Sequence, residues 1–353
     1  MGDWMAMENI LKKDLGSILE DTSVLWGDLR GKRIFITGGT GFFGCWLLES
    51  FLWANESLGL NASATVLTRN IERFQKKTPH LAANPSIQFH AGDVHSFDFP
   101  DGEYSFVIHA SNEAVNYSSS KDAPENVKNA IIQSAKHTLD FARHCGASNF
   151  LYTSSGSVYG HQPTDLPHIP ETYEGVRDTS QFRFAHGEGK KTAEDLCREY
   201  AEKYCFAAKI ARCFSFVGPY MPLDANYAIG NFIRNVIKNE PIIVKGDGTP
   251  YRSYLYAADL AIWLWTILFK GESGRPYNVG SEKEYTIAEI ARTLADFLHS
   301  PKVCISEKTS RSGPAERYVP SVRRAHDELG LSQRVDLKDA IERTISWLLT
   351  QSR

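Results

Sequence analysis

The chain has 353 residues, enough to bury a large core as one α/β unit or as two domains. Its 39 basic and 42 acidic residues nearly balance, which argues against a role on nucleic acid or on an anionic membrane surface. The six cysteines show no metal-ligand spacing, so we expect no metal site and a reducing, cytoplasmic setting.

The first predicted elements are a helical extension over residues 1–30, which lacks the features of a signal peptide, and a strand that ends in a glycine-rich turn. The β-prone residues 34–36 lead into Gly38, Gly41 and Gly44, and an apolar helical run follows. Glycines here permit the reversal, let a pyrophosphate approach main-chain N–H groups, and allow the helix to pack closely on the strand. The turn therefore predicts a dinucleotide site.

Strands and helices then alternate as far as about residue 214. Strands are predicted at 64–67, 86–90, 104–109, 149–153 and 209–216, helices at 126–145 and 187–204, and a loop at 161–185. This alternation indicates βαβ units with right-handed crossovers, and ligands are expected at the carboxyl ends of the strands. We predict a doubly wound α/β fold with a parallel sheet.

The end of the second predicted strand bears on the choice between NAD and NADP. An acidic residue at that position would hold the ribose 2′-hydroxyl of NAD, but the strand ends in Thr68, Arg69 and Asn70. Arg69 could meet the 2′-phosphate of NADP, or it could be a solvated surface charge. The sequence therefore tilts towards NADP and leaves NAD open.

After about residue 215 the alternation weakens. Helices are predicted at 229–238, 257–269, 287–298 and 337–349, with short strands at 242–245, 252–256 and 277–280. We predict an NAD(P)-binding domain over 31–214 and a smaller substrate lobe over 215–353, with segments at about 252–270 returning to the main domain. The apolar run at 260–269 is too short to span a bilayer.

Eight motifs in order now carry a resemblance to a known family. They are TGGTGFFG (37–44), GDV (92–94), VIHAS (107–111), TSSGSVYG (153–160), GEGKKTAE (187–194), ARCFSFVGP (211–219), GDGTPYRSYLYAAD (246–259) and YNVG (277–280). From about residue 32 to 349 the chain resembles the extended short-chain dehydrogenase/reductase family, specifically its nucleotide-sugar epimerases, dehydratases and decarboxylases. The resemblance implies a Rossmann-type fold, bound NAD or NADP, a nucleotide-diphosphate sugar as substrate, and a homodimer joined by helices 126–145 and 187–204 in a four-helix bundle.

The resemblance also implies roles for individual residues. The cofactor would be held by Gly38, Thr40, Gly41, Phe42, Phe43, Gly44, Asp93, Val94, His109, Ala110, Ser111 and Lys190, the last on the nicotinamide ribose. The sugar nucleotide would be held by Ser155, Ser215, Arg252 and Arg317, with both arginines on its diphosphate. The residues alone leave plainer interpretations open: Asp93 and Ser155 could cap their own turns, and His109 could be structural.

One departure from the family pattern concerns the catalytic base. The family places a tyrosine four residues before the lysine, on the same helical face. His186 stands there in this chain, with Lys190 one turn later. Histidine can act as a general base near neutral pH, but its ring is shorter than a phenol and nearby cations disfavour its charged form. Three interpretations stay open: His186 replaces the base, activity has been lost naturally or by engineering, or a tyrosine such as Tyr173 takes over.

Two further departures concern the substrate. Gly156 and Ser157 stand where the 4,6-dehydratases carry an acid and a base, and the decarboxylases have Glu at the Ser157 position; neither residue titrates. Ser215 replaces the family's asparagine. The sequence therefore favours an NAD(P)-dependent epimerase or oxidoreductase that transiently oxidises C4 of a nucleotide-diphosphate sugar. The alternatives are a 4,6-dehydratase, a UDP-glucuronate decarboxylase-like enzyme, and a catalytically impaired NAD(P)-binding sensor.

Overall fold

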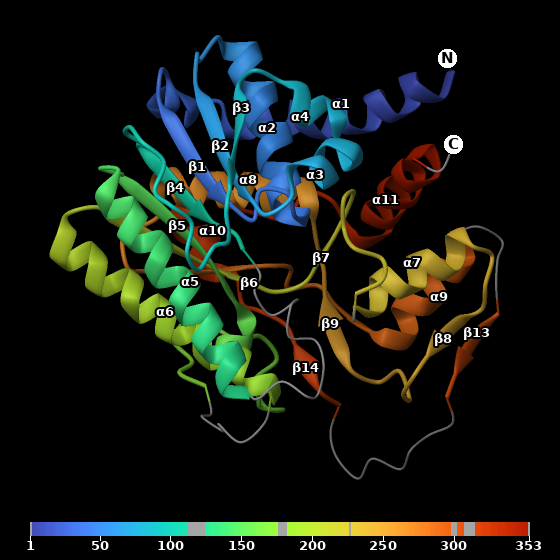
Figure 1. Ribbon diagram of the computed structural model, residues 1–353. Coiled ribbons are helices and arrows are strands. Elements are labelled where there is room, and N and C mark those ends of the chain that lie inside the picture. Colours follow the sequence, from blue (N-terminus) through green and yellow to red (C-terminus); the bar gives the residue numbers. More distant parts are fainter. Residues whose placement is uncertain are drawn as a thin grey trace.

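The computed structural model describes residues 2–111, 124–175, 182–225, 227–297, 302–306 and 315–351. Its centre is a seven-stranded parallel sheet in the order β11-β6-β5-β4-β1-β2-β3 (Figure 1). Because the order runs outward in both directions from β1, the predicted doubly wound α/β fold is confirmed. The strands are β1 (Arg33–Thr37), β2 (Ser63–Thr68), β3 (Ile87–Ala91), β4 (Phe106–His109), β5 (Asn149–Ser155), β6 (Ala207–Cys213) and β11 (Pro276–Val279).

Helices cover both faces of this sheet. Along β1, Ile34 and Ile36 pack with the helices of one face, whereas Phe35 packs with those of the other. This alternation is what a parallel strand buried on both sides requires. One face carries α1 (Gly2–Thr22), α2 (Phe42–Leu58) and α8 (Ala257–Lys270); the other carries α5 (Pro124–His144) and α6 (Phe182–Tyr204), which lie side by side (Figure 1).

The segments after β6 build a smaller region beside the carboxyl edge of the sheet. It contains three small sheets, β10-β7, β12-β9-β14 and β13-β8. Its elements are β7 (Phe216–Val217), α7 (Ala228–Ile237), β8 (Ile242–Val244), β9 (Tyr251–Ser253), β10 (Leu255–Tyr256), β12 (Glu284–Thr286), α9 (Ile287–Phe297), β13 (Val303–Ile305), β14 (Arg317–Tyr318), α10 (Arg323–Leu329) and α11 (Leu337–Gln351). The chain returns to the main sheet through α8 and β11.

Three expected boundaries were wrong. The strands expected at 209–216 and 252–256 each break into two, β6 and β7 and then β9 and β10, because the backbone changes partners after Phe214 and at Leu255. Phe214 donates its N–H to Val279, whereas Leu255 donates its N–H to Ser215. Residues 182–185, expected in a loop, form the first turn of α6. The short helices α3 (Ile71–Lys77) and α4 (Pro79–Ala83) were not predicted.

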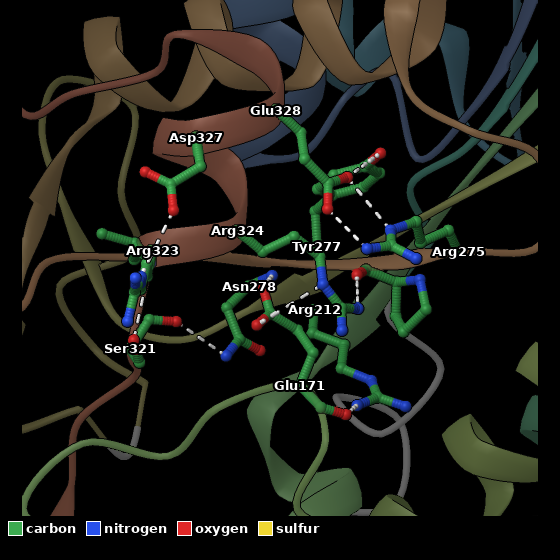
Figure 2. A network of polar contacts seen from close by, with 12 residues as sticks. Glu171, Arg212, Arg275, Tyr277, Asn278, Ser321, Arg323, Arg324, Asp327 and Glu328 are labelled. Atoms are coloured by element: carbon green, nitrogen blue, oxygen red, sulfur yellow. Dashed lines mark hydrogen bonds and ion pairs between the residues drawn. The ribbon is translucent and has the colours of Figure 1, made fainter.

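A network of polar contacts fixes the outer edge of the sheet (Figure 2). Asn278 of β11 donates its side-chain amide to the carbonyls of Ile169 at 2.8 Å and Ser321 at 2.9 Å. Its backbone N–H donates to the Glu171 carboxylate at 2.9 Å, and Arg212 of β6 donates to the Glu171 carbonyl at 3.3 Å. The segment after β5 is therefore tied to β6 and β11, beside the end of β5.

Helix α1 is held to the far end of the chain. Asp14 is buried and accepts hydrogen bonds from the Tyr256 hydroxyl at 2.6 Å and from Arg343 of α11 at 2.5 Å. Burial raises the pKa of Asp14, and the bonds from Tyr256 and Arg343 offset this rise only in part. No helix in the described part of the chain combines the length and the apolarity needed to cross a membrane.

Candidate active site

The glycine-rich turn between β1 and α2 has the shape expected of a phosphate cradle. Gly38 has φ +71°, and a Cβ on it would lie 2.3 Å from the Ala110 carbonyl oxygen. A Cβ on Gly44 would lie 2.3 Å from the Cα of Gly39, so the helix packs directly on the turn. Gly41 is exposed and begins α2 with no side-chain cap, which leaves the first N–H groups of the helix to an external acceptor. These features fit the pyrophosphate of a dinucleotide.

The other residues assigned to this turn flank it. Phe42 and Phe43 lie in the first turn of α2, and Phe43 packs edge-on against Phe216, with ring centroids 5.1 Å apart. The carbonyl of Thr40 accepts a hydrogen bond from Lys77 of α3 at 3.3 Å. Lys77 therefore adds a positive charge near the turn that the sequence did not single out.

The ends of β2 and β3 bring Arg69 and Asp93 together. The Arg69 guanidinium lies 3.8 Å from the Asp93 carboxylate, and Arg69 is largely exposed. Asp93 also accepts hydrogen bonds from the backbone N–H of His95 at 3.0 Å and its Nδ1 at 2.6 Å, so it caps its own turn. Burial acts to raise the pKa of Asp93, but the His95 bonds and Arg69 outweigh it and lower the pKa. Val94 packs beside them against the core.

At the end of β4, His109 is a fully buried connector. One ring nitrogen lies 3.1 Å from the Thr37 hydroxyl of β1 and 3.0 Å from the Thr138 hydroxyl of α5. Burial, and then the charge of Lys190, hold the pKa of His109 well below its ordinary value. Its neighbours Ala110 and Ser111 continue past the strand, beside Gly38.

The end of β5 and the start of α6 bring the three predicted catalytic residues into one cluster. Ser157, in the short 3₁₀ helix η3 (Gly156–Tyr159), lies between Ser155 and His186. Its Oγ is 2.9 Å from Ser155 Oγ and 2.9 Å from His186 Nδ1. Lys190, one helical turn after His186, is 4 % exposed and donates to the Thr153 carbonyl at 3.1 Å. Ser155 also caps η3 by accepting a hydrogen bond from the Ser157 N–H, which is the structural role that the sequence left open for it.

His186 is neutral at physiological pH in this environment. Burial first, and then the positive charge of Lys190, lower its pKa from 6.5 to about 3. Both effects disfavour the imidazolium form. The imidazole can therefore hold an extra proton only briefly, and it must then return that proton or release another one from its second nitrogen.

The low pKa of His186 makes stability depend on pH. Between about pH 6.5 and about pH 3 the unfolded chain binds a proton at this position that the folded chain does not, so stability falls as the pH is lowered through that window. Replacing His186 with glutamine is expected to reduce the slope of unfolding free energy against pH by up to about 1.4 kcal/mol per pH unit. Urea unfolding across this pH range measures the slope for the parent chain and for the glutamine variant. Equal slopes would contradict the low pKa of His186.

Tyr318 is a further candidate site residue, which was not predicted from the sequence. It lies at the end of β14 and shares a hydrogen bond with Ser155, and a Cβ on Gly156 would lie 2.6 Å from its hydroxyl. Burial raises the pKa of Tyr318, and the bond with Ser155 lowers it by less. Its position directly after Arg317 was the available signal. Tyr173, the tyrosine considered from the sequence, packs its ring near that of Tyr159.

The two arginines assigned to the diphosphate lie on adjacent strands but face opposite ways. Arg252 of β9 pairs in register with Tyr318, whereas Arg317 pairs with Tyr251, so their side chains leave the small sheet on opposite faces. Arg252 shares its face with Tyr318, and Arg317 stacks over the Tyr251 ring and pairs with Glu284. Ser215, between β6 and β7, binds Leu255 through its backbone carbonyl. Only Arg252 is placed on the Tyr318 side.

Comparison with known proteins decides the family. Residues 34–280 match the model of the NAD-dependent epimerase/dehydratase family. The chain belongs to this family. The sequence-based resemblance and the predicted type of enzyme are thereby confirmed, while the roles of individual site residues remain predictions. Within the described residues, no group of His, Cys, Asp and Glu could hold a metal ion.

The relatives and structural neighbours include proteins named as enzymes of nucleotide sugars. UDP-glucuronic acid decarboxylase 1 of Arabidopsis thaliana is 29% identical over 314 residues, which cover 89% of this chain and 69% of that protein. The UDP-glucuronic acid 4-epimerase of Bacillus cereus, in complex with UDP-glucuronic acid and NAD, has a TM-score of 0.75 at 22% identity and covers 90% of this chain and 99% of its own. The dTDP-glucose 4,6-dehydratase of Bacillus anthracis, in complex with NAD, has a TM-score of 0.72 at 17% identity, covering 90% and 96%.

Proposed function

We propose that this protein oxidises C4 of a nucleotide-diphosphate sugar transiently, as a 4-epimerase or a 4-oxidoreductase. When bound at the glycine-rich turn, NAD or NADP supplies a hydride acceptor. The observation that carries the proposal is the cluster at the end of β5: Ser155 can hold the sugar hydroxyl, and Lys190, fixed against the Thr153 carbonyl, can position the nicotinamide ribose.

A specific feature separates this proposal from decarboxylation and dehydration. The Ser157 side chain, which stands where decarboxylases carry glutamate, is a hydroxyl committed to Ser155 and His186. Gly156 has no side chain and is closed in by Tyr318 and Phe214. Neither position can protonate or deprotonate a sugar, whereas oxidation at C4 followed by return of the hydride needs no such pair.

Two other functions each have an observation in their favour. The decarboxylases among the relatives, at 26–29% identity, favour a UDP-glucuronate decarboxylase that uses a different acid–base group. The depressed pKa of His186 favours a protein that binds NAD(P) without turnover and acts as a sensor. The substrate panel below separates all three functions.

For the cofactor we propose a preference for NADP over NAD. Arg69 stands at the end of β2 without an acidic neighbour at the position that would hold the 2′-hydroxyl. Its guanidinium is exposed, and its ion pair with Asp93 at 3.8 Å is long enough to exchange for a phosphate. We also propose a homodimer through the exposed faces of α5 and α6, in a cytoplasmic setting, as the family resemblance implies.

The test is to identify the nucleotide released on denaturation and to incubate fresh protein with UDP-, dTDP-, GDP- and CDP-sugars. We expect NADP(H) or NAD(H) in the released fraction and a reduced-nicotinamide absorbance with one sugar class. The product is expected to be a C4 epimer or a 4-keto sugar that retains all its carbons. Release of carbon dioxide would favour the decarboxylase, and a bound cofactor that no sugar reduces would favour the sensor.

A further inference from the structure

A continuous line of hydrogen bonds runs from the sugar-binding hydroxyl to the histidine. Ser157 Oγ contacts Ser155 Oγ and His186 Nδ1, at 2.9 Å in each case. The backbone N–H of Ser157 also donates to Ser155 Oγ at 3.1 Å, which fixes the two serines relative to each other. Each member of the line can both donate and accept a proton.

Close packing holds this line in place. A Cβ on Gly187, the residue after His186, would lie 2.1 Å from the Ser157 carbonyl oxygen. Helix α6 therefore approaches η3 as closely as a glycine allows, and this approach brings the imidazole to Ser157. On the other side, the Tyr318 hydroxyl bonds to Ser155 and closes the space over Gly156. The close backbone packing of α6 on η3 and the Tyr318 bond together preorganise this geometry.

An imidazole at position 186 has two disadvantages compared with a phenol. Its ring is shorter, and burial with Lys190 nearby disfavours its charged form. Ser157 compensates for the first because its hydroxyl spans the gap to Ser155. The second is removed if the imidazole passes a proton on rather than keeping it, since it can accept at one nitrogen and release at the other. The His186 residue as a whole keeps intermediate solvent exposure, and passing the proton on requires that its Nε2 side reaches water.

We propose that Ser155, Ser157 and His186 form a proton relay that carries the C4 hydroxyl proton of the sugar to solvent. This inference rests on the proposed function. The sugar hydroxyl gives its proton to Ser155 Oγ, Ser155 gives its own to Ser157, and Ser157 gives its own to Nδ1 of His186. The C4–H bond breaks, its electron pair leaves as hydride to the oxidised nicotinamide, and the C=O bond forms. His186 then releases the proton on Nε2 to water, and reduction of the ketone reverses each transfer.

The test compares four variants: S157A, S157T, H186Y and the double variant H186Y/S157A. In S157A the relay is cut, and we expect kcat to fall about 10²- to 10³-fold with KM for the sugar within about threefold. S157T restores the hydroxyl and is expected to recover kcat to within about tenfold of the parent chain. In H186Y the phenol can reach the sugar hydroxyl directly, so adding S157A is expected to cost less than about threefold. Thermal unfolding confirms that each variant folds.

A second readout is independent of turnover. In protein labelled with ¹⁵N-histidine, the Nδ1 resonance of His186 is expected to shift in S157A and to return in S157T, with or without cofactor. A kcat that S157A leaves unchanged, or one that it lowers equally in both backgrounds, would overturn the relay and leave the proposed function standing. If neither the parent chain nor H186Y turns over any sugar of the panel, the proposed function itself fails, and the relay with it.

Discussion

Replacing Gly38 with alanine is expected to weaken dinucleotide binding strongly and to destabilise the fold. The new Cβ would lie 2.3 Å from the Ala110 carbonyl oxygen and 2.6 Å from the Ser111 nitrogen, and both are backbone atoms of the neighbouring strand end that cannot move aside. The residue would also hold φ +71°, a conformation that L-residues disfavour. Together these effects are expected to cost about 2–5 kcal/mol of unfolding free energy.

The same substitution is also expected to lower the affinity for the cofactor. Displacing the turn from β4 removes main-chain N–H groups from the pyrophosphate, at about 1.5–3 kcal/mol for each lost bond, so Kd is expected to rise about 100-fold or more. Urea unfolding and calorimetric titration with NAD and NADP measure the two effects.

Gly59 provides the matched control for Gly38. It ends α2 with φ +57°, and a Cβ there would meet nothing within 4 Å. G59A therefore carries the backbone strain without the collision, and we expect a cost of about 1–2 kcal/mol with cofactor affinity unchanged. Equal effects of the two substitutions would show that strain alone explains the loss and that the close approach of Gly38 to Ala110 is unimportant.

The second large effect is expected at Glu194, the buried carboxylate of α6. It is fully buried and accepts hydrogen bonds from Arg212 at 2.9 and 2.7 Å and from Ser154 at 2.6 Å. E194A leaves the Arg212 guanidinium, itself 6 % exposed, without its buried counter-charge. We expect a loss of about 3–5 kcal/mol in unfolding free energy, measured by urea denaturation. E194Q keeps the shape and should lose less.

Asp327 provides the control, because its ion pair with Arg323 is exposed (Figure 2). Solvent screens such a pair, so D327A is expected to leave the unfolding midpoint unchanged within error. A loss from D327A comparable with that from E194A would contradict the assignment of the stabilisation to burial. Because Glu194 lies one turn after Lys190 on α6, E194A should also displace the cluster of Ser155, Ser157, His186 and Lys190 and, under the proposed function, lower kcat.

The sequence predicted the parts of this structure that depend on local signals. The glycines at 38, 41 and 44 follow a β-prone stretch, and the alternation of elements to residue 214 allows essentially one sheet topology. His186 and Lys190 could be placed on one helical face from their spacing alone. Such predictions succeed because the residues that determine each local structure lie close to it in the sequence.

The features that escaped prediction depend on contacts between distant segments. Strand β14 has two residues and no periodicity, so beyond its place after Arg317 nothing in the sequence indicated that Tyr318 would lie beside Ser155. The opposite faces of Arg252 and Arg317 follow from strand register, which the sequence does not reveal. Ser157 was read as a missing carboxylate, and its bridging hydroxyl became visible only once α6 and η3 were placed together.

The contact between Asp14 and Arg343 has a consequence for synthesis on the ribosome. The two residues are 329 positions apart in the chain. At about 5–20 residues per second, α1 leaves the ribosome roughly 15–60 s before α11 exists. Throughout that interval Leu11, Leu15 and Ile18, which the finished fold buries, lack the surface of α11, and until Lys270 has been made they also lack the surface of α8. Because most helical stability in proteins comes from tertiary packing, the nascent chain presents an apolar segment to chaperones until its last helix closes over it.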